Sequence, residues 1–322
     1  MSGLELVCPA GTPSALEAAV AAGADAVYFG LRDRTNARNF PGLNFSPREA
    51  EDAVRTCRRH GVRAFLAVNT YPEAGAEQAW HEAVDLAAAI GVDALILADT
   101  GLADHAARKH PDLRLHLSVQ ASAANAEAVR FYQEAFGVRR VVLPRVLDVP
   151  AIGRLIAETG IEAEVFVFGG LCVMAEGRCS LSSYATGLSP NKDGVCSPAG
   201  HVRYDHEGDT LVSRLGGLTI NRTGPGENAG YPTLCKGRFT VHGAAGHLFE
   251  DPASLDATRL LPDLQAAGVT ALKVEGRQRG KAYVRDVVPR LRAAVDNAAP
   301  AALGGVMEGG RATTGAYEKG WR

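Results

Sequence analysis

The chain has 322 residues, of which 46% are hydrophobic and 22% charged, and its formal net charge is −2. This composition is typical of a globular protein with a large core, and it excludes disordered and fibrous classes. The longest apolar runs are about eight residues, far short of the ~20 that cross a bilayer, and the charge gives no general basic field for a polyanion. We therefore expect no transmembrane segment and no nucleic-acid partner.

A strand-like run followed by an alanine-rich amphipathic segment recurs about every 30 residues, the length of a β/α unit. The predicted strands are Glu5–Cys8, Ala26–Gly30, Arg63–Asn69, Ala94–Ala98, Leu113–Val119, Arg140–Leu143, Glu164–Phe168 and Ala271–Val274. The predicted helices are Ser14–Ala22, Pro47–Arg59, Gln78–Ile90, Leu102–Lys109, Ala124–Phe136, Val149–Glu158 and Leu255–Ala267. Several of them end at a glycine, which stops a helix at little cost. Eight such units predict a (β/α)8 barrel, with a doubly wound sheet as the alternative.

One unit is much longer than the others. About 100 residues separate Phe168 from Ala271, far more than a crossover between parallel strands needs. A sequence pattern typical of a β-hairpin within this segment, at His201–Tyr204 and Thr210–Arg214, predicts a small β-rich subdomain. We accordingly divide the chain into a barrel, a cysteine-rich insertion and a C-terminal tail, with the bounds 1–168 and 253–298 for the barrel, 169–252 for the insertion and 299–322 for the tail.

Four of the six cysteines fall in the insertion: Cys172, Cys179, Cys196 and Cys235. Thiolates bind soft or borderline metals, so the pattern indicates zinc or an iron–sulfur cluster. Structural zinc sites usually take cysteines in close pairs, and no close pair occurs here. A [4Fe–4S] cluster has four separate iron corners and accepts ligands from four separate pieces of backbone, so we favour it over zinc.

Disulfides are the remaining alternative for these cysteines. The chain opens Met-Ser-Gly-Leu-Glu, without the basic and apolar run of a signal peptide, so we expect a reducing, cytoplasmic location where structural disulfides are rare. Cys8 and Cys57 lie in a strand-like and a helix-like segment and are expected to be buried, unreactive thiols.

In a (β/α)8 barrel, ligands bind at the carboxyl ends of the strands, and Cys172 follows the seventh strand closely. Polar residues at the other strand ends are candidates for contacting a substrate, although a structural role is as plausible for each of them. Arginines would suit a carboxylate-bearing ligand, because the guanidinium fork binds carboxylates bidentately. The substrate-binding candidates are Arg145 and Gln120, the strongest two, with Arg38, Asn69, Glu275 and Arg277; Asn36, Thr70 and Asp99 also follow strands, and no catalytic residue is assigned.

Other chemistries find little support in the sequence. The nine histidines form no metal-binding helix motif, and neither a nucleophile elbow nor a phosphate-binding glycine loop is present. We therefore disfavour zinc proteolysis, serine hydrolysis and nucleotide binding.

The segment Phe168–Tyr184, with its first two insertion cysteines, resembles the signature of the peptidase U32 family. The resemblance covers nearly the whole chain and is greatest to the UbiU-like branch of that family. Further stretches that carry it are Glu5–Gly11, Ala24–Leu31, Thr35–Arg38, Gly42–Phe45, Ser118–Ala123, Val141–Leu147, Gly226–Arg238 and Lys273–Arg279.

The resemblance implies that the four insertion cysteines hold a [4Fe–4S] cluster. It also implies a heterodimer with a UbiV-like partner, and oxygen-independent hydroxylation of ubiquinone ring precursors with prephenate as the oxygen donor. A dicarboxylate donor would fit the arginines expected at the strand ends.

Other members of the family hydroxylate RNA bases, and a few are described as collagenolytic. The RNA-modifying members have a further C-terminal domain, and many members have an additional cysteine shortly after the third one, where this chain reads Cys196-Ser197-Pro198. Both differences favour the UbiU-like branch. An RNA-base hydroxylase and a non-catalytic subunit that passes electrons or serves as a scaffold remain the alternatives, and peptidase activity is not expected.

The C-terminal tail is rich in glycine but contains two aromatic residues, Tyr317 and Trp321. A solvated tail does not need such anchors. The sequence leaves open whether this segment is disordered or docks on the barrel or a partner.

Overall fold

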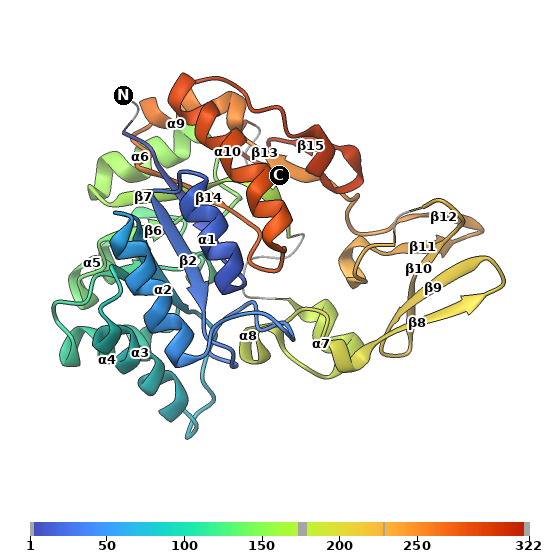
Figure 1. The fold of residues 1–322 in the computed structure, drawn as a ribbon, viewed down its shortest axis with the longest axis horizontal. Coiled ribbons are helices and arrows are strands. Elements are labelled where there is room, and N and C mark those ends of the chain that lie inside the picture. The colour runs from blue at the N-terminus through green and yellow to red at the C-terminus, as the bar shows by residue number, and fades with distance from the viewer. Residues whose placement is uncertain (1–2, 173–178, 228, 319–322) are drawn as a thin grey trace.

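The computed structural model describes residues 3–172, 179–227 and 229–318, and its centre is a closed barrel of parallel strands (Figure 1). Strands β1 to β7 pair in chain order, and β14 closes the ring by pairing with both β7 and β1. The barrel strands are β1 (Glu5–Pro9), β2 (Ala26–Gly30), β3 (Arg63–Val68), β4 (Ala94–Leu97), β5 (Leu115–Leu117), β6 (Arg140–Val142), β7 (Glu162–Gly170) and β14 (Ala271–Val274). Closure confirms the predicted (β/α)8 class, because a doubly wound sheet is open and has two edges.

Helices surround the barrel, and their ends follow local sequence signals. Ser46 and Glu49 form a reciprocal capping box at the start of α2, and Asp99 and Asp148 cap α4 and α6. None of the described helices is both long and apolar enough to span a membrane. The helices are α1 (Pro13–Ala21), α2 (Pro47–Arg59), α3 (Gln78–Ile90), α4 (Thr100–Lys109), α5 (Ala126–Phe136), α6 (Val149–Thr159), α9 (Leu261–Ala266) and α10 (Lys281–Asn297).

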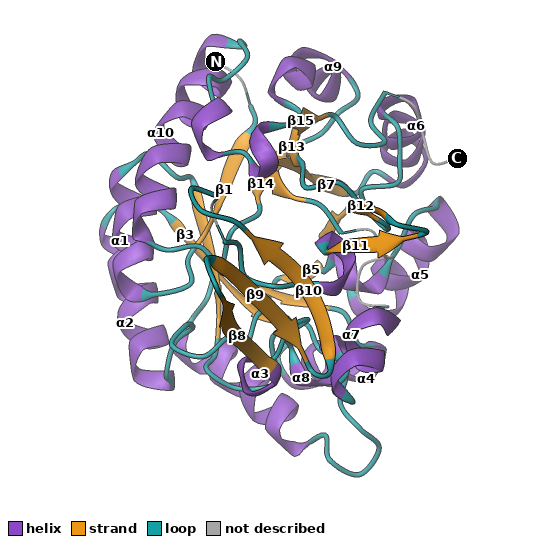
Figure 2. Ribbon diagram, turned by 90° about the vertical axis from the view of Figure 1, so that its right-hand side faces the viewer, coloured by secondary structure: helices purple, strands orange, loops and turns teal. Residues whose placement is uncertain are grey.

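The insertion between β7 and β14 extends away from the barrel on one side (Figure 1), and its strands β8 to β12 lie in front of the barrel in Figure 2. It contains a three-stranded antiparallel sheet and a separate hairpin, β11–β12, and Leu215, Ile220 and Leu234 form a small core of its own. Its elements are α7 (Ser180–Thr186), α8 (Pro190–Asp193), β8 (Val202–Glu207), β9 (Thr210–Leu215), β10 (Leu218–Thr223), β11 (Arg238–Val241) and β12 (Ala244–His247).

The prediction of a helix over Leu255–Ala267 is wrong in its first half. The chain there forms a short strand, β13 (Ser254–Asp256), which pairs antiparallel with the end of β7. The side chain of Asp256 then accepts hydrogen bonds from the backbone and hydroxyl of Thr258, at 3.0 and 2.7 Å, and this turn ends the strand. Helix α9 starts only at Leu261, with Pro262 in its first turn.

Alternate residues of the barrel strands face the surrounding helices and the barrel interior. In β1, Leu6 and Cys8 pack into the large core beneath the helices, whereas Val7 belongs to a small interior cluster with Phe65. Both Cys8 and Cys57, on α2, are fully buried in the outer core. Neither thiol is near the insertion cysteines in the sequence or exposed for a metal.

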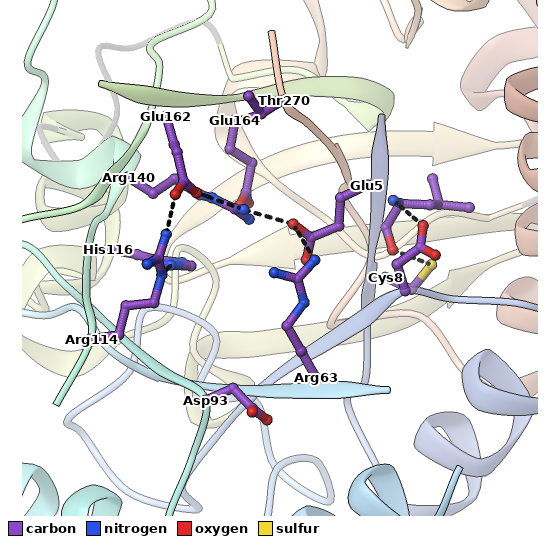
Figure 3. A network of polar contacts seen from close by, with 12 residues as sticks. Glu5, Cys8, Arg63, Asp93, Arg114, His116, Arg140, Glu162, Glu164 and Thr270 are labelled. Atoms are coloured by element: carbon purple, nitrogen blue, oxygen red, sulfur yellow. Dashed lines mark hydrogen bonds and ion pairs between the residues drawn. The ribbon is translucent and has the colours of Figure 1, made fainter. Parts of the chain in front are cut away.

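The amino-terminal half of the barrel interior is filled by charged side chains (Figure 3). Arg140, 2% exposed, contacts Glu5 at 2.7 Å and Glu164 at 3.3 Å, and Lys273 contacts Glu164 at 2.5 Å. His116 is also buried there, and burial, together with the neighbouring cations, keeps its pKa well below the usual value. Arg140, Lys273 and their glutamate partners are buried charges, which a barrel interior tolerates only when they are paired.

The described part of the C-terminal segment docks on the barrel of its own chain. Strand β15 (Ala312–Thr313) pairs in parallel with β13, and the Tyr317 side chain is 3% exposed. The Tyr317 hydroxyl donates to the carbonyl of Phe166 in β7 at 2.8 Å, and its carbonyl accepts from the amide of Val149 at 3.0 Å. Trp321 lies outside the described residues.

We expect Tyr317→Phe to lower the free energy of unfolding by about 1 kcal/mol, the usual worth of one hydrogen bond. Tyr317→Ala would cost about 3–5 kcal/mol, because it also empties a buried aromatic site. Chemical denaturation of the two variants measures both values. If Tyr317→Ala unfolded at the same denaturant concentration as the parent chain, the docking would be energetically insignificant.

Candidate functional site

The four insertion cysteines occupy loops and helix ends that face the carboxyl end of the barrel. Cys172 follows the last residue of β7 by two positions, and Cys179 immediately precedes α7. Cys196 lies between α8 and β8, and Cys235 lies in a short 3-10 turn, Leu234–Lys236. All are free thiols; Cys172 and Cys196 keep exposed surface, and the other two are half-buried. Residues 173–178, between the first two cysteines, lie outside the described residues.

Electrostatic interactions connect the four thiols with one another. Protein atoms crowd around Cys196 and raise its pKa although some of its surface reaches solvent, Arg38 lowers this pKa, and Cys179 and Cys172 raise it further. Burial likewise raises the pKa of Cys235 to about 11, with smaller contributions from Cys172 and Cys196. Sites far apart in the sequence are thus brought within electrostatic reach of one another.

Among residues 3–172, 179–227 and 229–318, no group of three or more His, Cys, Asp or Glu side chains is arranged to hold a metal ion. The fit to a cluster rests on the chemistry of the donor set: four thiols on four separate segments are the ligands that four iron corners take. The identity of the metal group therefore stays a prediction.

The loop after β2 brings Arg38 to the cysteines. The Asn36 side chain fixes this loop by donating to the Leu31 carbonyl at 2.5 Å and accepting from the Arg38 amide at 2.9 Å. The loop also binds the insertion, because the Asn39 amide donates to the carbonyl of Gly194 at 3.0 Å. Gly194 has a φ of 78°, and a Cβ there would lie 2.2 Å from the Asn36 carbonyl oxygen, so only glycine allows this approach.

Glu275 is the acidic centre of the strand ends. Its side chain is 9% exposed; one carboxylate oxygen lies 3.6 Å from an Arg38 guanidinium nitrogen. The other oxygen accepts from the amide of Gly170 at 3.3 Å and from the Gln278 side chain at 3.1 Å. Burial opposes its ionisation, but Arg38, and after it Arg145, lower its pKa below the usual value. Glu275 therefore stands charged between the end of β7 and the loop after β2.

Arg277 supports the loop after β2 through a buried hydrogen bond to Asn36. It is 5% exposed, its guanidinium donates to the Asn36 side-chain oxygen at 3.1 Å, and it lies 5.5 Å from the centre of the Tyr28 ring. Burial lowers the pKa of Arg277 to about 10. A Cβ on Gly30 would lie 2.7 Å from this guanidinium, so the glycine makes room for it. Arg277 is thus a buried support for the loop that carries Arg38.

Arg145 lies against the same region. Its guanidinium carbon lies 4.0 Å from the centre of the Phe166 ring, a cation–π contact that holds the side chain against β7. Its charge contributes to the lowered pKa of Glu275. Arg38, Arg145, Glu275 and Arg277 are therefore brought together by the fold.

Other candidates have structural contacts at the strand ends. Asn69 is buried, accepts from the Ala37 amide at 3.0 Å and donates to the Ser118 hydroxyl at 3.1 Å. Thr70 accepts from the Trp80 indole at 3.0 Å, and Asp99 caps α4. Gln120 lies in the 3-10 turn after β5, where its carbonyl accepts from Tyr71 at 2.7 Å.

Sequence reasoning missed Gln278 and Arg279, which both act on Glu275. It also missed the interior charges. A usable signal was present, since Glu164 and Lys273 are charged residues within strands that are mostly apolar.

Comparison with known proteins places the chain in one family. The sequence profile described as Peptidase family U32 matches residues 11–307. The tRNA hydroxylation protein P of Escherichia coli is 32% identical, and that of Haemophilus influenzae 31% identical; each match covers 92% of this chain and 68% of the relative. A 23S rRNA 5-hydroxycytidine synthase of Escherichia coli is 30% identical over 91% of this chain and 39% of its own length. These relatives are thus longer than the chain.

Proposed function

The chain belongs to the peptidase U32 family, and from this membership and its site we propose that it is the iron–sulfur subunit of an oxygen-independent hydroxylase. The observation that carries the proposal is that the Arg38–Glu275 pair lies at the strand ends, where the charge of Arg38 interacts with Cys172 and Cys196. Relatives with 31% and 32% identity are named as hydroxylation proteins. Proximity of these groups to the strand ends agrees with where barrels bind their substrates.

Cys172, Cys179, Cys196 and Cys235 would hold a [4Fe–4S] cluster, one thiolate to each iron. Such a cluster supplies one-electron chemistry at a potential set by its surroundings. Anaerobic reconstitution followed by analysis of iron, sulfide and zinc tests this part: about four iron and four sulfide for each chain are expected for the cluster. Stoichiometric zinc in place of iron would exclude it.

For the substrate, we propose a ubiquinone ring precursor, with prephenate as oxygen donor and a UbiV-like protein as the second subunit. In this reaction one ring C–H becomes C–OH, and the donor supplies the oxygen and is reduced by two electrons. The guanidinium groups of Arg38 and Arg145 support a donor that carries carboxylates, because both act on Glu275 at the strand ends and a guanidinium can bind a carboxylate bidentately.

The names of the relatives favour a second candidate, hydroxylation of an RNA base. An anaerobic assay separates the two: the purified chain, with and without a UbiV-like protein, is given prephenate and either a ubiquinone ring precursor or unmodified tRNA. Hydroxylation of the ring precursor alone supports the first candidate, and hydroxylation of tRNA alone supports the second.

A non-catalytic role is the other alternative. A subunit that only passes electrons or supports the partner would not bind the oxygen donor. Prephenate binding to the isolated chain, measured by calorimetry under anaerobic conditions, supports catalysis by this chain, whereas binding only to the partner would assign the chain the supporting role.

We expect Arg145→Met to weaken prephenate binding about 10- to 150-fold, the equivalent of the ~1.5–3 kcal/mol lost with one charged hydrogen bond. Methionine keeps much of the length and can still pack on Phe166, so the fold and the iron content should be retained. Unchanged affinity with the cluster intact would show that Arg145 has only a packing role.

A further inference from the structure

Arg38 stands where two of the cysteine-bearing segments meet the barrel. The loop that carries it is bound to Gly194, two residues before Cys196, and its guanidinium contacts Glu275 at 3.6 Å. Glu275 in turn accepts from the amide of Gly170, two residues before Cys172. The ion pair is therefore flanked by the chain that leads to Cys172 on one side and the chain that leads to Cys196 on the other.

The positive charge of Arg38 interacts both with Glu275 and with the cysteines Cys196 and Cys172. Burial opposes its charged form, yet Glu275, and after it Cys196, Tyr28 and Cys172, hold the pKa of Arg38 above its ordinary value. The guanidinium is also anchored by a hydrogen bond to the Ala37 carbonyl at 2.8 Å. The side chain is 35% exposed, so water screens part of its charge, but less than at a fully exposed arginine.

We propose that Arg38, held by Glu275, sets the reduction potential of the metal group bound by the four cysteines. The inference rests on the proposed cluster and goes beyond it by assigning a role to a pair of residues that are not ligands. A cluster gains negative charge on reduction, and a fixed cation near its thiolates stabilises the reduced form. Glu275 has the opposite effect, and its position beside Arg38 limits how far the potential rises.

This arrangement also connects the cluster with the substrate. A carboxylate that binds at the strand ends would add negative charge beside Arg38 and compete with Glu275 for the guanidinium. Binding of the donor would add negative charge near the cluster and thereby disfavour its reduction. Donor binding would therefore lower the reduction potential of the wild-type protein, and would lower it less without Arg38.

The test is a redox titration of the anaerobically reconstituted protein, followed by its visible spectrum. Arg38→Met is expected to lower the midpoint potential enough to change the ratio of reduced to oxidised cluster about tenfold at a fixed solution potential, which is about 59 mV for a one-electron couple. Glu275→Gln is expected to shift it in the opposite direction. Arg38→Lys keeps the charge and should remain near the wild-type value.

Arg32→Met provides the matched control. Arg32 starts the same loop, forms an ion pair with Glu49 at 2.9 Å and donates to the carbonyl of Asn44 at 3.0 Å, but its side chain is 50% exposed. Its loss loosens the loop without removing the charge next to the thiols. An unchanged potential in Arg32→Met and opposite shifts in the other two variants support a charge effect.

Other outcomes overturn the inference. Equal potentials in wild type, Arg38→Met and Glu275→Gln, with iron retained, would show that the pair does not act on the cluster, while the proposed hydroxylase could still stand. Shifts in the same direction would show loosening instead of charge. If Arg38→Met loses its iron, the other two variants still test the inference. A midpoint potential near the wild-type value in Arg38→Lys and a raised one in Glu275→Gln support it, and an unchanged potential in Glu275→Gln overturns it. Wild-type protein without iron would overturn the proposed function itself.

Discussion

Replacement of any one of Cys172, Cys179, Cys196 or Cys235 by alanine is expected to strip or destabilise the cluster and abolish hydroxylation. Each thiolate would hold one iron corner, so the loss of one leaves that corner open to solvent and oxidation. Iron and sulfide analysis after anaerobic reconstitution, with the visible absorption of thiolate-bound iron, measures the effect. A single variant of the four that retained full iron would remove that cysteine from the ligand set.

Cys8→Ala and Cys57→Ala are the matched controls for these four variants. Both thiols are fully buried in the outer core, and burial raises the pKa of Cys57 to about 12, so it stays a neutral thiol at physiological pH. We expect both variants to keep their iron and to lose about 1 kcal/mol of stability, as for other small changes in a core. Loss of iron from Cys8→Ala would show that the ligand assignment is wrong.

The barrel was predictable because its signals are local. A helix that ends at a left-handed glycine and a strand that begins two or three residues later form the same joint at Gly91, Gly137 and Gly160, whose φ values are 70°, 70° and 64°. Each joint is specified by residues that are neighbours in the chain. Eight repeats of a local pattern were therefore enough for the fold class.

The start of α9 was not predictable in the same way. Leu255 fits a helix pattern, but its backbone pairs with Gly169, which is 86 residues earlier (255 − 169). The competing partner lies at the end of β7, on the far side of the whole insertion. A periodic pattern of apolar residues predicts a helix, but it does not show that a distant strand has an unpaired edge with which the same residues can form a β-ladder.

In the candidate site, too, residue types were predictable from the sequence, whereas contacts between distant segments were not. The four cysteines are proposed as metal ligands from residue type and spacing alone, because few roles suit four loop thiols. Arg38 and Glu275 were identified only as residues after strands. Their pairing, and the hydrogen bond between Asn39 and Gly194, depend on how the insertion folds back on the loop after β2. Composition and spacing carry no information on that contact.

The charged barrel interior gives the largest expected effect on stability. Arg140 is 2% exposed and contacts Glu5, Glu162 and Glu164 (Figure 3). Arg140→Met keeps much of the volume, but among the described residues it leaves only Arg63 paired with Glu5, at 2.9 Å, and only Lys273 paired with Glu164. Removal of one partner from a buried ionic network costs about 3–5 kcal/mol, because the remaining charges are left poorly compensated.

The pH dependence of this variant identifies the cause. Burial already raises the pKa of Glu5, and Arg140 is the main group that lowers it. Without Arg140 this pKa rises further, so the folded state prefers protonated Glu5. A raised pKa in the folded state stabilises at pH values below the pKa of the unfolded chain, and this contribution is lost as pH rises through the folded-state pKa. We therefore expect the loss of stability to be largest at neutral and alkaline pH and to shrink toward acid pH.

Two further variants complete this test. Arg140→Met combined with Glu5→Gln should recover part of the lost stability at neutral pH, since the amide carries no charge to compensate. Arg55→Met removes an arginine that is 57% exposed and pairs with Glu51 at 2.8 Å, and should cost at most about 0.5 kcal/mol. Denaturation curves at neutral and acid pH measure all three variants. The loss of stability in Arg140→Met would reflect packing if it did not depend on pH and was not relieved by Glu5→Gln. The reason is that the energy of a cavity does not change with protonation, whereas the energy of an uncompensated carboxylate does.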